Sequence, residues 1–184
     1  MPKKDPILQA GAPLLRAVAK PVPAKDIGSA SLHKIIARMR AALKPEENGV
    51  AIAAPQIGEP LRIFVVSGKV FAESEHAEPA LPGHKPGRRE ASAELPDMVF
   101  INPELVRASR KKSAVSEGCL SVRGVYGMVR RSDKATVRAL DERGKPFTYH
   151  GSGLVAQIFQ HEIDHLSGVL FTDKAEKIDD ESHP

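Results

Sequence analysis

The sequence has very little cysteine and few aromatic residues. Cys119 is the single cysteine, so the chain cannot form an intramolecular disulfide, which indicates a reducing compartment or a functional thiol. Tryptophan is absent, and aromatic residues make up only 4% of the chain. Single-stranded nucleic acids bind on aromatic platforms, and the net charge of +4 is spread along the sequence. We therefore expect no DNA partner.

Long hydrophobic runs are missing as well. No window approaches the roughly 18 consecutive apolar residues that a membrane-spanning helix needs. The apolar stretches near the N-terminus are interrupted by Gln9, Gly11, Pro13 and Arg16, which is untypical of a secretory signal. The sequence predicts a cytoplasmic protein that does not bind membranes. An organellar protein whose targeting peptide has been removed would look the same.

The overall composition is that of an ordinary globular protein. With 184 residues, 41% of them apolar and 27% charged, the chain can build one core, and a single domain over residues 1–184 is predicted. Apolar residues recur at helical spacing over 29–44, where Ser29 or Ser31 can cap a helix. Short β-branched runs at 61–66 and 98–103 predict buried strands.

Three further segments have distinct patterns. Residues 134–150 alternate on both sides of a turn and predict a β-hairpin. The stretch near 68–97, rich in proline, glycine and charge, predicts a surface loop, with His76 and His84 as solvated loop residues. The chain ends in a short polar tail over residues 174–184.

The last regular segment contains "QHEIDHLSG" at residues 160–168 and has the period of an amphipathic helix. Ser152 can cap this helix, and Gly168 suits a left-handed C-terminus. Four residues share one stripe that is expected to face inward: Leu154, Ile158, His161 and His165. The predicted fold class is α+β, with mostly antiparallel strands packed around a long central C-terminal helix that carries HExxH.

The histidine pair in this helix is a candidate metal site. Histidines four residues apart project one turn apart from the same side of a helix, so His161 and His165 can reach one cation. Glu162 lies about 100° around the helix and can take a proton from an activated water. The alternative is a pair of core histidines, each of which would need a hydrogen-bond partner within an apolar stripe, which is costly.

Two other segments offer what such a site would need. The sequence "SEGCLSVRG" at 116–124 contains Cys119, which can supply a third ligand or can be a small buried apolar residue. The sequence "NGVAIAAPQIG" at 48–58 contains Gln56, whose amide can donate to an oxyanion if this loop passes the metal. Alone, Gln56 would be an ordinary surface amide. Both alternatives stay open on the residues alone.

Taken together, the segments "GVAIAAPQ", "EGCLS" and "QHEIDH", in that order, resemble the peptide deformylase family, whose members remove the formyl group from new N-formylmethionyl chains. The resemblance also takes in "INPEL" and "RALDERGKPF". It covers most of the chain except the segment near 68–97 and the tail. It implies a metallo-hydrolase of protein biosynthesis that acts co-translationally on nascent N-formylmethionyl peptides, with the ribosome near the exit tunnel as a second candidate partner.

The resemblance also implies roles for individual residues. Cys119, His161 and His165 look like the metal ligands, with Fe²⁺ as the expected native ion and Zn²⁺, Ni²⁺ or Co²⁺ able to occupy the site. Metal-activated water would attack the formyl carbon with Glu162 as general base, and formate would leave. Gln56 and the backbone N–H of Leu120 look like the donors to the oxyanion. The residues implied to bind the substrate are Val50, Gly118 and Ile158. Glu117 and Arg131 are implied to form an ion pair that supports the site. The alternative for that pair is two unconnected surface charges.

The chain departs from the family pattern at three positions. Ala51 replaces a glycine and is expected either to narrow the substrate groove or to require a different backbone angle. Arg123 and Arg130 stand where the family usually has proline, which predicts a looser loop and more positive charge near the cleft mouth.

Two other functions remain open at this stage. An HExxH zinc peptidase would take its third ligand downstream of the helix, where only residues 166–184 follow. The second alternative is a catalytically weak, deformylase-like binding module, which would have no need to keep the three ligands, Gln56 and Glu162 all at once.

Overall fold

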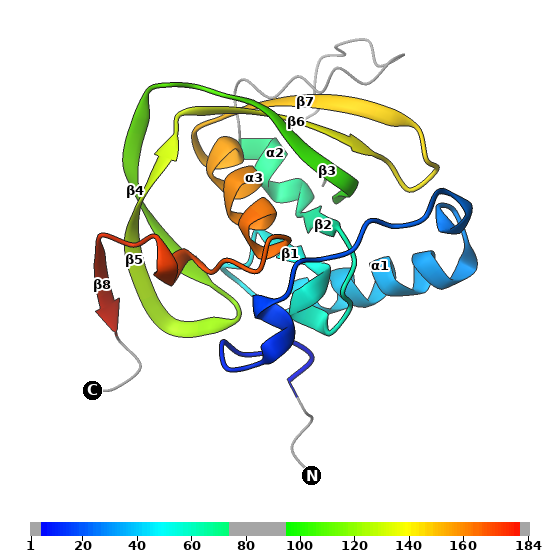
Figure 1. Ribbon diagram of the computed structural model, residues 1–184, viewed down its shortest axis with the longest axis horizontal. Helices are drawn as coiled ribbons and strands as arrows, with labels where there is room; N and C mark the ends of the chain where they lie inside the picture. The colour runs from blue at the N-terminus through cyan, green and yellow to red at the C-terminus, as the bar shows by residue number, and fades with distance from the viewer. Residues whose placement is uncertain (1–4, 74–94, 181–184) are drawn as a thin grey trace.

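The computed structural model describes residues 5–73 and 95–180, which form two antiparallel sheets around a central helix (Figure 1). The larger sheet has the strand order β1-β2-β3-β6-β7, comprising β1 (Ala51–Ala53), β2 (Ile63–Val66), β3 (Met98–Ala108), β6 (Lys134–Leu140) and β7 (Pro146–Ser152). The smaller sheet has the order β4-β5-β8, comprising β4 (Lys112–Cys119), β5 (Val122–Ser132) and β8 (Lys177–Asp180). The predicted α+β class with mostly antiparallel strands is confirmed.

The central helix is α3 (Gly153–His165), drawn in orange in Figure 1, which contacts strands of both sheets. Its Phe159 is fully buried, with ring-centroid distances of 6.2, 5.2 and 5.6 Å to Phe64, Phe100 and Tyr149 respectively. Burial of one phenylalanine side chain stabilises a fold by about 1.5–3 kcal/mol. This aromatic cluster therefore fixes where α3 lies against the larger sheet.

The ends of α3 differ in part from the expectation. Ser152 occupies the N-cap position, but its side chain accepts no capping hydrogen bond. Leu154 is 47% exposed, so the prediction that the whole stripe faces inward is wrong at its first residue, where the helix borders an open pocket. Gly168 has φ of +73°, and a Cβ there would lie 2.5 Å from the carbonyl oxygen of Arg16. Glycine is needed at that position because of both conformation and close approach.

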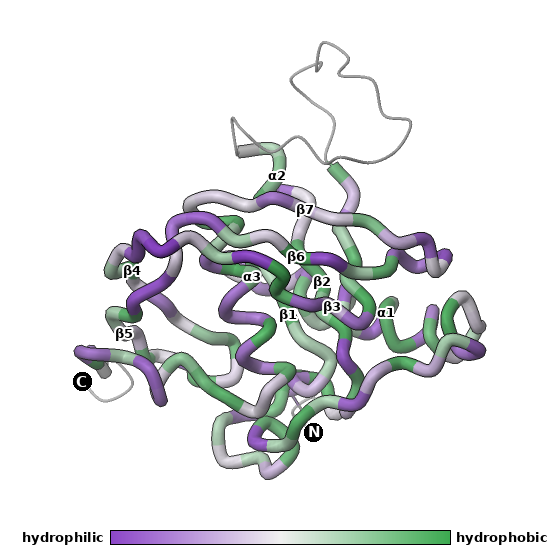
Figure 2. The backbone as a smooth tube through the Cα atoms, turned by 45° about the horizontal axis from the view of Figure 1, so that its top comes forward, coloured by the Kyte–Doolittle hydropathy of each residue, from purple (hydrophilic) through white to green (hydrophobic). Residues whose placement is uncertain are grey.

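The first helix, α1 (Ala30–Leu43), forms as its period predicts. Of the two candidate caps, Ser29 is the one used, because its Oγ accepts from the backbone N–H of Leu32 at 3.2 Å. The apolar stripe of α1 is buried at Leu32, Ile36, Met39 and Leu43. It packs against apolar residues of β2 and of the first part of β3; the two strands lie in the middle of the molecule in Figure 2.

The hairpin predicted over 134–150 is confirmed as β6 and β7. Lys134 pairs with Ser152, and the register continues to Leu140 opposite Pro146. The turn between the strands contains Gly144 at φ +78°, whose N–H donates to the carbonyl of Asp141 at 2.9 Å.

Several short elements are not indicated by the sequence pattern. The segment near 68–97, expected to be a loop, begins with helix α2 (Gly68–Glu73), and residues 74–94, with His76 and His84, lie outside the described residues. The predicted polar tail includes β8, which pairs with β5. The residues that the structure describes also form four 3₁₀ helices: η1 (Pro13–Arg16), η2 (Ala24–Asp26), η3 (Ala54–Ile57) and η4 (Phe171–Asp173). Within the described ranges, none of the helices has the length and apolarity to cross a membrane.

Candidate metal centre and its pocket

Three potential metal ligands converge beside a pocket, although they come from distant parts of the sequence; Cys119 and His161 line the pocket and His165 is buried next to them. Cys119 ends β4, while His161 and His165 lie on α3, and their ligand atoms are all within 4.8 Å of one another. The Sγ of Cys119 is 3.2 Å from Nε2 of His165, and the two imidazole centroids are 4.9 Å apart. The protein thus brings together one thiol and two imidazoles, a donor set that suits a divalent transition metal. The third candidate ligand, Cys119, precedes the helix in the sequence, so the structure does not support the peptidase alternative, which needs a third ligand after the helix.

A buried ion pair orients one of these histidines. Nδ1 of His161 is 3.0 Å from Oε2 of Glu117, which leaves its Nε2 for a ligand. Glu117 in turn accepts two hydrogen bonds from Arg131, at 2.7 and 2.8 Å, and both side chains are buried. The predicted pairing of Glu117 with Arg131 is therefore present. Such outer partners fix the tautomer and the orientation of a ligand histidine.

The ion pair continues beyond Arg131. Its Nη1 donates to Asp164 at 2.6 Å, and Asp164 also accepts from Lys174 at 2.6 and 2.7 Å. Burial raises the pKa of Glu117, but hydrogen bonds from Arg131 and His161 outweigh burial and lower it to about 2. Glu117 is consequently a carboxylate at neutral pH.

The charges around the histidine pair favour a cation. Burial lowers the pKa of His161, but its contacts with Cys119 and Glu117 and the charge of Glu162 outweigh burial and raise it to about 10. The same acidic surroundings that favour a proton on this ring would favour a divalent cation beside it. Burial lowers the pKa of His165 well below its usual value, so that ring is neutral, as a metal ligand must be.

Glu162 is buried beside the histidines without a complete set of partners. Burial raises the pKa of its carboxyl to about 7. Within the described part of the chain, its Oε2 has no hydrogen-bond partner, and neither does Nδ1 of His165. A buried carboxylate oxygen without a partner is costly, because burial removes its hydration. The residues therefore fit a site that holds a cation and a water or substrate atom near Glu162.

The amide of Gln56 faces the same place. Gln56 is only 2% exposed, so the interpretation as a surface amide is wrong. The backbone N–H of Ala53 donates to its Oε1 at 2.8 Å and thereby fixes the amide, whose Nε2 lies 3.1 Å from Oγ of Ser121 and 3.6 Å from Sγ of Cys119. The amide nitrogen therefore faces Ser121 and one of the candidate ligands, Cys119.

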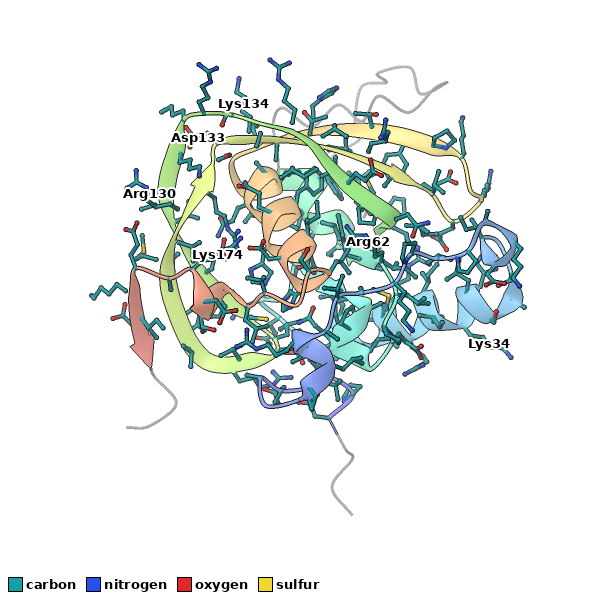
Figure 3. The ribbon with its side chains drawn as sticks, viewed as in Figure 1. Lys34, Arg62, Arg130, Asp133, Lys134 and Lys174 are labelled. Carbon is teal, nitrogen blue, oxygen red and sulfur yellow. The ribbon has the colours of Figure 1, made fainter. Side chains whose placement is uncertain are left out.

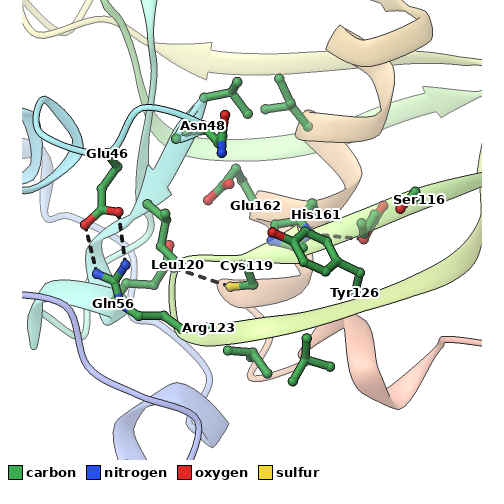
Figure 4. A pocket seen from close by; sticks show the side chains of 18 of the residues that line it. Glu46, Asn48, Gln56, Ser116, Cys119, Leu120, Arg123, Tyr126, His161 and Glu162 are labelled. Atoms are coloured by element: carbon green, nitrogen blue, oxygen red, sulfur yellow. Dashed lines mark hydrogen bonds and ion pairs between the residues drawn. The ribbon is translucent and has the colours of Figure 1, made fainter. Parts of the chain in front are cut away.

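These groups form one end of an open pocket of about 640 Å³ (Figure 4). One wall comes from the segment before β1, the opposite wall from the β4–β5 hairpin, and the floor from α3. The predicted substrate residues Val50, Gly118 and Ile158 all line it, as does Leu120. Ala51 lines it too, at the position where the groove is expected to narrow.

The two arginines that depart from the family pattern behave differently from expectation. Arg123 borders the pocket, but its charge is paired with Glu46 and Asp5, so it adds no free positive charge there (Figure 4). Arg130 does not line the pocket; it points away from the protein in Figure 3, because neighbouring residues of a strand face opposite sides and Arg131 faces inward.

Some residues of the site were not predicted from the sequence. Asp164 lies within the "QHEIDH" motif, so its position on the helix next to the histidines could have been read from the sequence. Ser121 follows the cysteine by two residues and is fully buried. Glu46 carries no local signal, since its role depends on a contact with Arg123, 77 residues away. Lys174 is ten residues from Asp164, but it lies beyond the end of α3, so the helical period does not predict their contact.

Known proteins are similar to this chain in sequence and in fold. A family model described as "Polypeptide deformylase" matches residues 4–181. The chain is 38% identical over 178 residues to a peptide deformylase from Mesorhizobium japonicum, covering 97% of this chain and 87% of the relative. It is 37% identical over 170 residues to the chloroplastic peptide deformylase 1A of Solanum lycopersicum, covering 91% of this chain but 58% of that relative. A Met-Ala-Ser-bound crystal structure of a class I type b peptide deformylase from Acinetobacter baumannii has a TM-score of 0.73 at 32% identity, covering 92% and 97% of the two chains.

Proposed function

The chain belongs to the polypeptide deformylase family, and from this membership and its site we propose that it removes the N-formyl group from the N-terminal methionine of new polypeptides. The products are formate and a peptide with a free N-terminal amine. The observation that carries this proposal is the convergence of Cys119, His161 and His165 next to an open pocket that Cys119, His161 and Glu162 line.

The metal-binding roles follow from the donor set. Cys119, as a thiolate, and His161 and His165, as neutral imidazoles, would hold one divalent cation, with Fe²⁺ as the expected native ion and Zn²⁺, Ni²⁺ or Co²⁺ as possible substitutes. When bound, such a cation supplies Lewis acidity, which polarises a carbonyl group and lowers the pKa of water. Glu117 and Arg131 keep the ring of His161 in its binding orientation.

Glu162 is the proposed general base. It takes a proton from the attacking water, whose oxygen bonds to the formyl carbon, and it returns the proton to the nitrogen as the C–N bond breaks. The pKa of about 7 suits both halves of this transfer at neutral pH.

Gln56 and the backbone N–H of Leu120 are the proposed donors to the oxygen that gains negative charge in the transition state. Gln56 is suited to this role because Ala53 holds its amide in place before substrate arrives. A donor that needs no reorganisation stabilises the transition state more than a mobile one does.

The pocket also suits an extended peptide. Both β1 and β4 are terminal strands of their sheets, and both border the pocket, so a substrate can pair with them as an added strand. In this arrangement the peptide lies along the Val50 and Gly118 segments, with its methionine side chain near Ile158. The substrate would be a nascent chain in the cytoplasm, or in an organelle for a targeted form, close to the ribosomal exit tunnel.

An anaerobic assay of formate release tests the proposal. Protein loaded with Fe²⁺ or Ni²⁺ should release formate from N-formyl-Met-Ala-Ser and should leave unformylated Met-Ala-Ser intact. Glu162→Ala should fold and retain metal but be nearly inert, whereas Cys119→Ala should lose metal. Equal turnover by Glu162→Ala would remove the assigned base, and cleavage of the peptide backbone would favour the peptidase alternative.

A further inference from the structure

Three segments that are distant in the sequence meet at Arg123, at the mouth of the pocket. Its Nη1 and Nη2 donate to the two carboxylate oxygens of Glu46 at 3.0 and 2.8 Å, which is a bidentate pair (Figure 4). Nη2 also donates to Asp5 at 3.2 Å. We call Arg123, Glu46 and Asp5 the ionic clasp.

The clasp joins the two walls of the pocket. Arg123 lies near the start of β5, just after the tight connection from Cys119, which pairs with Val122. A restraint on Arg123 is therefore a restraint on the hairpin tip that carries Cys119 and Leu120. Glu46 lies on the other wall, in the connection between α1 and β1, and both Glu46 and Arg123 line the pocket.

The N-terminal segment reinforces this connection. The N–H of Ile7 donates to the other carboxylate oxygen of Asp5 at 2.9 Å, which fixes Asp5 toward the clasp. Gln9 donates to the carbonyl of Leu120 at 3.2 Å, and the N–H of Leu8 donates to the carbonyl of Gln56 at 2.7 Å. The segment thus contacts both the hairpin tip and the residue proposed to hold the oxyanion.

We propose that the ionic clasp positions the two walls of the peptide groove, and that Arg123 is a positioning residue for substrate binding; this inference rests on the proposed function. Direct recognition of a peptide carboxylate is disfavoured, because both Nη atoms already donate to carboxylates of the protein. Proline restrains a turn covalently, whereas the clasp restrains it with charges. The effect of the ionic clasp on substrate binding therefore depends on the salt concentration.

The exposure of the clasp supports this salt dependence. The Arg123 side chain is 45% exposed and that of Glu46 is 22% exposed, so ions in solution can screen the pair. The hydrogen bond from Arg123 lowers the pKa of Glu46, which keeps the carboxylate charged at neutral pH.

The test measures kinetics with N-formyl-Met-Ala-Ser amide, a peptide without a terminal carboxylate, at low and high salt. Arg123→Ala should raise KM roughly two- to fivefold at low salt, the range that exposed ion pairs support, with kcat unchanged. Glu46→Gln should act similarly, Arg123→Lys should be intermediate, and adding Glu46→Gln to Arg123→Ala should change little. In the wild type, KM should rise with salt, and this dependence should disappear in Arg123→Ala.

Arg138→Ala is the matched control, because it removes an exposed ion pair with Glu104 that does not border the pocket. It should leave KM and its salt dependence unchanged. The inference is overturned if Arg123→Ala keeps the wild-type KM, or if KM changes only for a peptide that ends in a carboxylate, which would indicate direct recognition. If Arg123→Ala does not fold, Glu46→Gln takes its place, and the same comparison of KM and its salt dependence decides the inference.

A separate measurement distinguishes failure of the clasp from failure of the proposed function. If the wild type releases no formate, the proposed function is wrong, and the clasp is then judged by calorimetric binding of unformylated Met-Ala-Ser amide. Weaker binding by Arg123→Ala than by Arg138→Ala would support the clasp, and equal binding would refute it.

Discussion

Replacing Arg131 with methionine tests the buried ion pairs that support His161. The change keeps a long side chain but removes the guanidinium, which makes two hydrogen bonds to Glu117 and one to Asp164. Asp164 would keep its partner Lys174, whereas Glu117 would lose both hydrogen bonds from Arg131 and keep only its contact with His161.

The expected loss is large because these groups are buried. The Arg131 and Glu117 side chains are 5% and 2% exposed, so solvent cannot replace the missing charge. Removing one partner of a buried ion pair typically costs about 3–5 kcal/mol. For a chain of this size, about 2–4 °C of melting temperature corresponds to each kcal/mol, so Arg131→Met should melt about 6–20 °C lower.

Urea unfolding of the metal-free protein measures this loss without a contribution from metal binding. The double variant Arg131→Met with Glu117→Gln should lose less than Arg131→Met alone, because the buried carboxylate that Arg131 stabilised is gone as well. Arg138→Ala is the exposed control and should cost less than about 1 kcal/mol. The reasoning would be refuted if Arg131→Met behaved like this control, or if the double variant were as unstable as the single one.

Three further outcomes follow from the site and its surroundings. Gln56→Ala should lower kcat about 10²–10³-fold with little change in KM or metal content, because it removes a preorganised oxyanion donor; a changed KM alone would contradict this role. Gly118→Ala should raise KM several-fold in the formate assay, because its Cβ would lie 2.9 Å from the ring of Tyr126, and adding Tyr126→Ala should restore KM. The hydrogen bond from Arg16 lowers the pKa of Asp173, so this carboxylate stabilises the fold above its unfolded-state pKa and loses that effect as the pH falls through its lower folded-state pKa. Melting curves should therefore show Asp173→Asn less stable than wild type at pH 7 and similar to it at strongly acidic pH; an equal difference at both pH values would contradict the linkage.

The sequence predicted the elements whose pattern is local. The apolar period of α1 and the alternation of β6 and β7 are each set by neighbours within a few residues, and both elements form as expected. Leu154 was predicted wrongly, because its helical period is the same whether its side chain meets a strand or an open pocket. The strand β8 gave no hydrophobic signal, because its polar residues join the sheet through backbone hydrogen bonds to β5.

The site was predicted in part for a similar reason. The spacing of His161 and His165 is a property of one helix turn, so their common direction could be read from the sequence. The contact of Arg123 with Glu46 joins positions 77 residues apart, and no local pattern carries it. An arginine that replaces a usual proline was therefore expected to loosen the loop, whereas it ties the hairpin tip to the opposite wall.

The charges of the site explain why the donor set suits a divalent cation. Glu117 is balanced by Arg131, and Asp164 by Lys174, so these two pairs contribute little net charge. His165 is neutral because burial lowers its pKa. Two acidic groups then remain beside the pocket, the thiol of Cys119 and the carboxyl of Glu162. The surroundings of His161 raise its pKa to about 10, so in the metal-free protein its proton supplies one positive charge. A divalent cation that replaced this proton would balance both acidic groups when they are ionised, and this compensation would replace the hydration that burial removes.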